Sequence, residues 1–246
     1  AERIRALITR LVEDRAALIA RGEAPDDLAT KIMTMADPET GETFEPSEMV
    51  DQVAIFFLAG HETSASALAW TLYLLATHPE WQEKVAEEAA DLEADFSQLS
   101  KLKATRDVFR EALRLYPPVP MMVRETTQPE TFRKRAIRKG AQIVLSPWHL
   151  QRHERMWDRP DDFDPSRWRT EGGKASAREA YMPFSAGPRV CTGASFAMAE
   201  GVLLTALIVR AFRITASEEH VPVPVAHLTV RSRDGIRLKL TRRKSD

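Results

Sequence analysis

The chain has 246 residues, of which 43% are hydrophobic and 29% are charged, and its formal net charge is -1. This length and composition are typical of a globular protein that buries one sizeable core, and they exclude a disordered chain. The near-zero net charge gives no general electrostatic attraction to nucleic acid, so we expect no nucleic-acid partner. The single cysteine excludes intrachain disulfides and multi-cysteine zinc sites, and it fits a reducing compartment, so we expect a cytoplasmic location.

The longest uninterrupted apolar run lies within residues 53–60, far short of the roughly 20 residues that a transmembrane helix needs. We therefore expect no membrane segment in this chain, and no secretory signal pattern opens it. The chain begins without Met and already inside a helical pattern, which suggests that it is a piece of a longer protein.

Helical periodicity dominates the first half of the chain. Helices are predicted over residues 1–22, 27–35, 46–78, 80–92 and 104–116. The first two form a scaffold region, residues 1–45. The helix over residues 46–78 is apolar nearly all round, which is typical of a fully buried core helix. Pro79 stands where a first-turn proline belongs, and Pro117 ends the last of these helices.

The second half of the chain has shorter elements. Proline, threonine and β-branched residues between positions 119 and 150 predict small strands. Residues 152–193 predict a long loop, residues 194–213 an apolar helix, and the tail short strands around 221–230 and 236–240. The predicted fold class is therefore mainly α with small β-sheets (α+β).

The most specific motif surrounds the cysteine and reads Phe-Ser-Ala-Gly-Pro-Arg-Val-Cys-Thr-Gly over residues 184–193. Two glycines and a proline allow a tight loop that places the sulfur just before a helix N-terminus. Backbone amides and the helix dipole favour the thiolate there, and the thiolate is the form that binds a metal. The alternative is a buried structural cysteine in a glycine turn.

This motif resembles the heme-binding signature of the cytochromes P450. The matching positions are Phe184, Gly187, Arg189, Cys191 and Gly193. The resemblance implies that heme b, iron protoporphyrin IX, is the cofactor, and that Cys191 is the axial ligand of its iron. Arg189 would then meet a carboxylate of the cofactor.

A second match lies in the predicted core helix, where Ala-Gly-His-Glu-Thr-Ser spans residues 59–64. It resembles the oxygen-activation motif of the same family. Ala59 and Gly60 leave room for a flat cofactor or dioxygen, and the resemblance implies that Glu62 and Thr63 supply protons. The alternative is a polar pocket satisfied by neighbouring loops.

A third match concerns structure and not catalysis. Glu111 and Arg114 lie one turn apart on one helical face, which alone indicates only a common surface salt bridge. In the family such a pair joins an arginine from a later loop, and Arg167 stands in the matching place. The resemblance thus implies a buried network of Glu111, Arg114 and Arg167. Arg124 occupies a position that often pairs with a heme propionate, although an ordinary surface arginine is the alternative.

The three motifs occur in family order, and the resemblance covers essentially the whole chain but only the C-terminal half of the family's domain. It implies an incomplete cytochrome P450 fold that lacks the N-terminal helices. The implied function is a heme-thiolate monooxygenase that activates dioxygen and inserts one oxygen atom into a small apolar substrate. Electrons would come from a ferredoxin or flavoprotein reductase, because no flavin or nicotinamide fingerprint is present.

Two alternatives stay open from the sequence. One is a heme-thiolate isomerase or peroxygenase that needs no external reductant. The other is a heme-free helical fragment without activity. This chain lacks a counterpart of the family's N-terminal half, and we expect the monooxygenase function to need that half.

Overall fold

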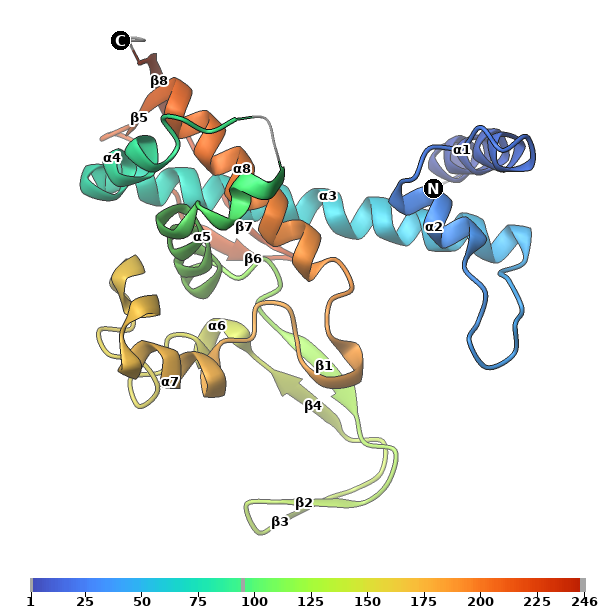
Figure 1. The fold of residues 1–246 in the computed structure, drawn as a ribbon. Coiled ribbons are helices and arrows are strands. Elements are labelled where there is room, and N and C mark those ends of the chain that lie inside the picture. Colours follow the sequence, from blue (N-terminus) through green and yellow to red (C-terminus); the bar gives the residue numbers. More distant parts are fainter. Residues whose placement is uncertain (1, 94–95, 244–246) are drawn as a thin grey trace. The chain divides into compact units, whose positions relative to one another are not determined.

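The computed structural model describes residues 2–93 and 96–243, and it is mainly helical with small β-sheets, as predicted (Figure 1). The helices are α1 (Glu2–Ala20), α2 (Leu28–Thr34), α3 (Pro46–Thr77), α4 (Pro79–Glu88), η1 (Phe96–Ser100), α5 (Lys103–Leu115), α6 (Pro147–Leu150), η2 (Pro165–Arg169), α7 (Glu171–Ala180), η3 (Gly187–Arg189) and α8 (Ala194–Ala211). The strands are β1 (Met122–Glu125), β2 (Glu130–Phe132), β3 (Arg135–Ile137), β4 (Gln142–Leu145), β5 (Phe212–Ala216), β6 (Pro224–Ala226), β7 (Val230–Ser232) and β8 (Leu238–Arg242).

The chain divides into two compact units, Ala1–Glu62 and Thr63–Asp246, and the division falls inside helix α3. The first unit contains α1, α2 and the first half of α3. Its small core is made by Ile8, Val12, Met49 and Val50. Helix α2 begins at a capping carboxylate, because Asp27 accepts a hydrogen bond from the backbone N–H of Thr30 at 3.0 Å.

The second unit has its core where α4, α5 and α8 pack on one another, together with the second half of α3. Leu75, Val85, Val108 and Val209 represent these four helices in the core, and each is fully buried. Helix α8 is the one described helix that is long and apolar enough to cross a membrane. It packs against α4 and α5, so it is a core helix of this unit.

Within the described residues, the strands form four two-stranded antiparallel sheets, β1 with β4, β2 with β3, β5 with β8 and β6 with β7. Val123 is opposite Val144 in the first of them, and Ile214 is opposite Leu240 in the third. Strand β5 follows α8 directly, and the sequence pattern did not predict it. Single arginines, Arg210 and Arg213, interrupt the apolar residues that continue from α8 into β5, so periodicity shows no clear boundary between the two elements.

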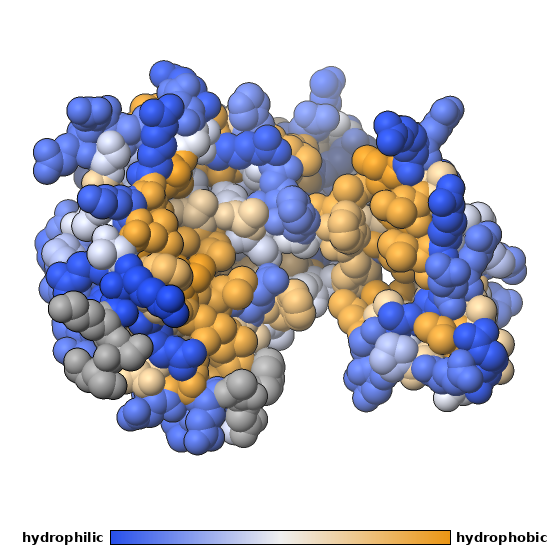
Figure 2. Space-filling view, turned by 90° about the horizontal axis from the view of Figure 1, so that it is seen from above, coloured by the Kyte–Doolittle hydropathy of each residue, from blue (hydrophilic) through white to orange (hydrophobic). Residues whose placement is uncertain are grey.

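One expectation about helix α3 is wrong for its first half. The pattern predicted a fully buried helix, but Ile55, Phe57 and Leu58 are each more than half exposed. In the first unit the core contacts of α3 involve Met49 and Val50 and leave these three side chains in solvent. Apolar residues thus remain on the surface, as the space-filling view shows (Figure 2). A hydrophobic pattern indicates the capacity for burial, and the partner surface decides whether burial occurs.

The long loop predicted over residues 152–193 also needs a correction, because it contains the ten-residue helix α7. Its glycine pair, Gly172 and Gly173, indicated a loop from sequence. Thr170 caps the helix, since its side chain accepts a hydrogen bond from the backbone N–H of Gly173 at 3.0 Å. The absence of a side chain at Gly173 is needed there, because a Cβ would overlap the carbonyl group of Arg167.

Candidate functional site

The chain's only cysteine lies in a loop, residues 184–193, that leads into helix α8; we call it the cysteine loop. The backbone N–H of Cys191 donates a hydrogen bond to the carbonyl oxygen of Phe184 at 2.8 Å and so closes the loop. Ser185 and Gly187 have positive φ angles of 64° and 66°, a conformation that glycine adopts without steric cost. The side chain of Cys191 is exposed, so the loop presents the sulfur at the surface of its unit.

The sulfur also lies close to the start of α8. A Cβ placed on Gly193 would be 3.9 Å from Sγ of Cys191. The backbone N–H of Ala197 donates to the carbonyl oxygen of Gly193 at 2.8 Å, so the helix begins directly after the loop. Among the residues that the structure describes, no three His, Cys, Asp or Glu side chains gather into a metal site. A lone sulfur suits an iron whose other ligands come from a cofactor, and not a zinc ion held by protein side chains.

The surroundings of the sulfur fit a flat apolar cofactor that carries carboxylates. Val190 and Phe196 flank the cysteine in sequence and are 52% and 65% exposed, so they offer an apolar surface. Arg189 is exposed beside them and has no hydrogen-bond or ion-pair partner within residues 2–93 and 96–243. Phe184, by contrast, packs against the core of the second unit and anchors the start of the loop.

Arg124, on strand β1, lies against the cysteine loop. Its Nη2 donates a hydrogen bond to Oγ of Ser185 at 3.1 Å, and its Nη1 donates to the carbonyl oxygen of Val123 at 3.0 Å. The structure thus brings Arg124 to the loop, as its predicted role requires. Its pairing with a heme propionate stays a prediction.

The residues of the second motif lie on α3, which continues without interruption through residues 59–63. Ala59 and Gly60 are exposed, whereas Glu62 and Thr63 are partly buried. A Cβ on Gly60 would meet no atom within 4 Å, so the position is open. These features leave space at Gly60, and the roles of Glu62 and Thr63 in proton supply stay predictions.

The third set of residues forms a buried network. Glu111 accepts hydrogen bonds from Arg114, with Nη2 at 2.8 Å from Oε1 and Nε at 3.0 Å from Oε2. The same Oε1 accepts from Nε of Arg167 at 2.8 Å. Glu111 and Arg114 are fully buried, and Arg167 is 5% exposed. The carboxylate therefore holds two guanidinium groups, one from its own helix and one from η2.

Gln151 connects this network to the cysteine loop, and sequence reasoning missed it. The backbone carbonyl of Gln151 accepts from Nη1 of Arg114 at 2.8 Å, and its Oε1 accepts from the backbone N–H of Met182 at 2.7 Å. Met182 precedes Phe184 by two residues. Gln151 is fully buried, yet a glutamine among polar residues gives no sequence signal of burial.

Tyr181 strengthens the same attachment. Its hydroxyl donates to the backbone carbonyl of Arg110 at 3.3 Å, and its ring packs edge-on against Trp168. Burial raises the pKa of the Tyr181 hydroxyl above its usual range, so the group stays neutral at physiological pH. The segment leading into the cysteine loop is thus held by a neutral hydroxyl and a buried amide.

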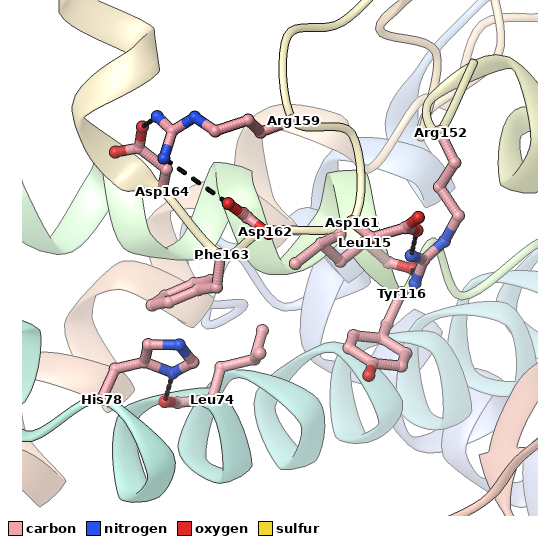
Figure 3. Close-up of a pocket in the computed structure, with 10 residues that line it drawn as sticks. All are labelled: Leu74, His78, Leu115, Tyr116, Arg152, Arg159, Asp161, Asp162, Phe163 and Asp164. Atoms are coloured by element: carbon pink, nitrogen blue, oxygen red, sulfur yellow. Dashed lines mark hydrogen bonds and ion pairs between the residues drawn. The ribbon is translucent and has the colours of Figure 1, made fainter. Parts of the chain in front are cut away.

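A pocket of about 540 Å³ lies elsewhere in this unit, between the ends of α3 and α5 and residues 159–164 (Figure 3). Its charged side chains pair with one another, Arg152 with Asp161 at 2.8 Å and Arg159 with Asp164 at 2.7 Å. None of its lining residues belongs to the cysteine loop or to the motif on α3. The pocket is therefore separate from the candidate site.

Comparison with protein families gives a match to the cytochrome P450 model over residues 1–240. Among curated relatives, human (Homo sapiens) cytochrome P450 4A11 is 38% identical over 217 residues, which are 86% of this chain and 41% of that protein. The taurochenodeoxycholic 6 alpha-hydroxylase of the pig (Sus scrofa) is 36% identical over 215 residues, which are 85% of this chain and 42% of that protein.

Solved structures show the same likeness. The heme domain of cytochrome P450DA has a TM-score of 0.89 and 30% identity, covering 99% of this chain and 54% of that one. The structure of CYP102L1, also a cytochrome P450, has a TM-score of 0.90 and 29% identity, covering 98% of this chain and 56% of that one. The chain thus spans about two fifths to one half of the length of the proteins that it resembles.

Proposed function

This chain belongs to the cytochrome P450 family, and from that premise we propose that it carries the heme-thiolate site of a monooxygenase. The observation that supports the proposal is the presentation of Cys191 by a closed loop at the start of α8, with its side chain exposed. The curated relatives are named as cytochromes P450 and, in one case, as a hydroxylase. The chain spans less than half of their length, so the activity of the whole protein is part of the proposal.

The residues of the loop suit heme b as the cofactor. Cys191 would provide the thiolate ligand of the iron, while Val190 and Phe196 would cover apolar parts of the ring. Arg189 and Arg124 would meet the two carboxylates, since both guanidinium groups lie on or against the loop. When bound, heme supplies the activation of dioxygen, and the protein sets its ligand, its access and its supply of protons.

Glu62 and Thr63 are the proposed proton carriers. Both lie on α3 and are partly buried, so neither is fully hydrated. The carboxyl of Glu62 would take up a proton from water, and the hydroxyl of Thr63 would pass that proton on toward the heme face of the helix. The resemblance of its motif implies that Gly60 would leave room for the dioxygen.

The proposed reaction inserts one oxygen atom into a small apolar substrate and releases the other as water. Two electrons per turnover must come from outside, and we propose a ferredoxin or a flavoprotein reductase as the donor. A cytoplasmic location stays a prediction from the sequence.

The experiment that tests the proposal is a spectrum of the heme-loaded protein, reduced and exposed to carbon monoxide. Thiolate ligation should give a red-shifted Soret band in the wild-type protein. The chain has one cysteine, so Cys191→Ser should abolish this band. Ser195→Ala is the matched control, because Ser195 is also exposed and lies one turn further along; its spectrum should equal the wild type.

Two results would overturn the proposal. One is a wild-type protein, with its N-terminal half present, that binds no heme or binds heme without the red-shifted band. The other is oxygenation of substrate by peroxide alone at the rate seen with an electron donor and dioxygen, which would assign a peroxygenase instead.

A further inference from the structure

The hairpin of β2 and β3 projects from the second unit beyond the β1–β4 sheet, away from the helices (Figure 1). Phe132 is opposite Arg135 at the end of the antiparallel pair, and Arg133 and Lys134 form the two-residue turn between them. Residues 127–136 are all exposed. The hairpin therefore buries almost none of its own side chains, and a role in the core does not explain its sequence.

Positive charge is concentrated in this hairpin and just after it. Residues 130–139 contain one acidic side chain, Glu130, and five basic ones: Arg133, Lys134, Arg135, Arg138 and Lys139. All five basic residues are exposed, and within the described part of the chain none of them forms an ion pair. The chain as a whole has a net charge of -1, so this patch is a local and uncompensated concentration of charge.

The turn keeps its basic residues in an unfavourable backbone conformation. Arg133 and Lys134 have φ angles of 49° and 65°. A two-residue hairpin turn with both φ angles positive usually carries Asn-Gly, because glycine has no Cβ and asparagine tolerates positive φ, whereas most other residues are strained there. Strain of this kind is typical of functional positions, and here it places two cations at the tip of the hairpin.

An exposed aromatic ring lies among these cations. Phe132 is 64% exposed, and the guanidinium carbon of Arg133 is 5.6 Å from the centre of its ring. Residues opposite each other in a sheet share a face, so Arg135 flanks the same ring. An apolar ring flanked by two cations matches the boundary between anionic lipid headgroups and acyl chains.

We propose that this basic hairpin docks the protein onto an anionic lipid surface, with Phe132 entering the headgroup layer and the five cations facing the lipid phosphates and carboxylates. A narrow hairpin offers little of the broad surface that a specific protein partner requires. A membrane has no such requirement, because its surface is continuous and its charge is spread over many lipids. The proposal does not depend on heme or on catalysis.

The experiment measures sedimentation of the purified full chain with vesicles of phosphatidylcholine, either pure or containing about one third phosphatidylserine. The key variant is Arg133→Asn combined with Lys134→Gly, which removes two charges and suits the turn. The matched control removes two exposed charges elsewhere, Lys101→Asn with Lys103→Gln. A third variant, Phe132→Ser, removes the ring and keeps the charges.

The wild type should bind the acidic vesicles and not the neutral ones, and high salt should weaken the binding. The turn variant should bind about thirty-fold more weakly, from the usual contribution of a lysine or arginine near an anionic surface. The control pair should change the affinity by less than about threefold. Phe132→Ser should weaken binding several-fold. Urea unfolding of each variant shows whether the fold is kept.

Three outcomes would overturn the proposal. The first is no binding of the wild type to acidic vesicles at low salt. The second is an equal loss in the control pair, which would mean general electrostatics and not the hairpin. The third is binding to soluble polyglutamate as tight as to acidic vesicles, which would assign the hairpin to an acidic protein partner.

Discussion

Arg114 holds both carboxylate oxygens of Glu111 within the core, through Nη2 at 2.8 Å from Oε1 and Nε at 3.0 Å from Oε2, and neither side chain is exposed. Their spacing of three residues is common on helix surfaces, where such a pair contributes little to stability. Burial changes its importance, because each charge has lost its water and depends on the other. The pair therefore fixes the position of the Arg114 guanidinium group and, through it, of the other groups that Arg114 binds.

The first prediction concerns Glu111→Gln. This change leaves the buried guanidinium groups of Arg114 and Arg167 without a counter-charge, so we expect a loss of about 3–5 kcal/mol in the free energy of unfolding. Urea unfolding near neutral pH measures it. Glu171→Gln is the control, because Glu171 pairs with Lys174 at an exposed site; its unfolding midpoint should not move. A loss below about 1 kcal/mol in Glu111→Gln would show that solvent reaches the network.

The second prediction concerns the contact of α8 with α5. A Cβ at Gly201 would overlap the ring of Phe109, which is only 2% exposed and cannot move into solvent. Gly201→Ala should therefore cost about 1–3 kcal/mol of unfolding free energy through overpacking. Phe109→Leu, added to Gly201→Ala, should restore part of that loss, because the smaller side chain leaves room for the methyl group.

Gly172→Ala is the control for this prediction. Gly172 lies in helix α7, and a Cβ there would meet nothing within 4 Å. Alanine has the higher helix propensity, so the control should leave stability unchanged or raise it by up to about 1 kcal/mol. If Gly201→Ala were as stable as this control, the close packing of α8 on α5 would be wrong.

The sequence predicted those parts of the fold and site that depend on local order. Hydrophobic periodicity, with Pro79 and Pro117 as boundaries, indicated the main helices, because proline and side-chain spacing act within a few residues. The cysteine loop was predicted for the same reason: the glycines and the cysteine lie within ten residues of one another. The link between Arg167 and Glu111 was predicted from the order of the motifs in the family, because no local pattern joins residues so far apart.

The rest depends on which surfaces meet, and the sequence pattern does not contain this information. Gln151 reads as a polar loop residue, yet it is fully buried because the carbonyl groups of Leu113 and Arg114 accept from its amide at 3.0 Å. Phe57 reads as a core residue, yet it is 63% exposed because no described element of its unit covers it. In both cases tertiary contacts override residue type.

Glu83 provides another long-range contact, between α4 and the end of the described chain. Its Oε2 accepts from Nη1 of Arg243 at 2.7 Å, and its Oε1 lies 3.0 Å from Nη2 of Arg213. The hydrogen bond from Arg243 lowers the pKa of Glu83 most, burial opposes this effect, and the charges of Arg243 and Arg213 lower the pKa further. Arg243 also donates to the carbonyl of Val209 at 2.9 Å, so the contact holds the chain after β8 against α8.

The third prediction follows from the sign of this shift. A carboxyl whose pKa is lowered by folding adds stability above its unfolded pKa and loses that contribution as pH falls through its folded pKa. The side chain is 38% exposed, so solvent screening limits the contribution to about 1 kcal/mol or less. Glu83→Gln should therefore reduce the free energy of unfolding by that amount near neutral pH.

The difference in unfolding free energy between Glu83→Gln and the wild type should shrink once the pH falls below 4.5, the ordinary pKa of a glutamate carboxyl. Urea unfolding of both proteins between neutral and acidic pH measures it, and a difference that stays constant with pH would show that Glu83 acts through its shape and not its charge.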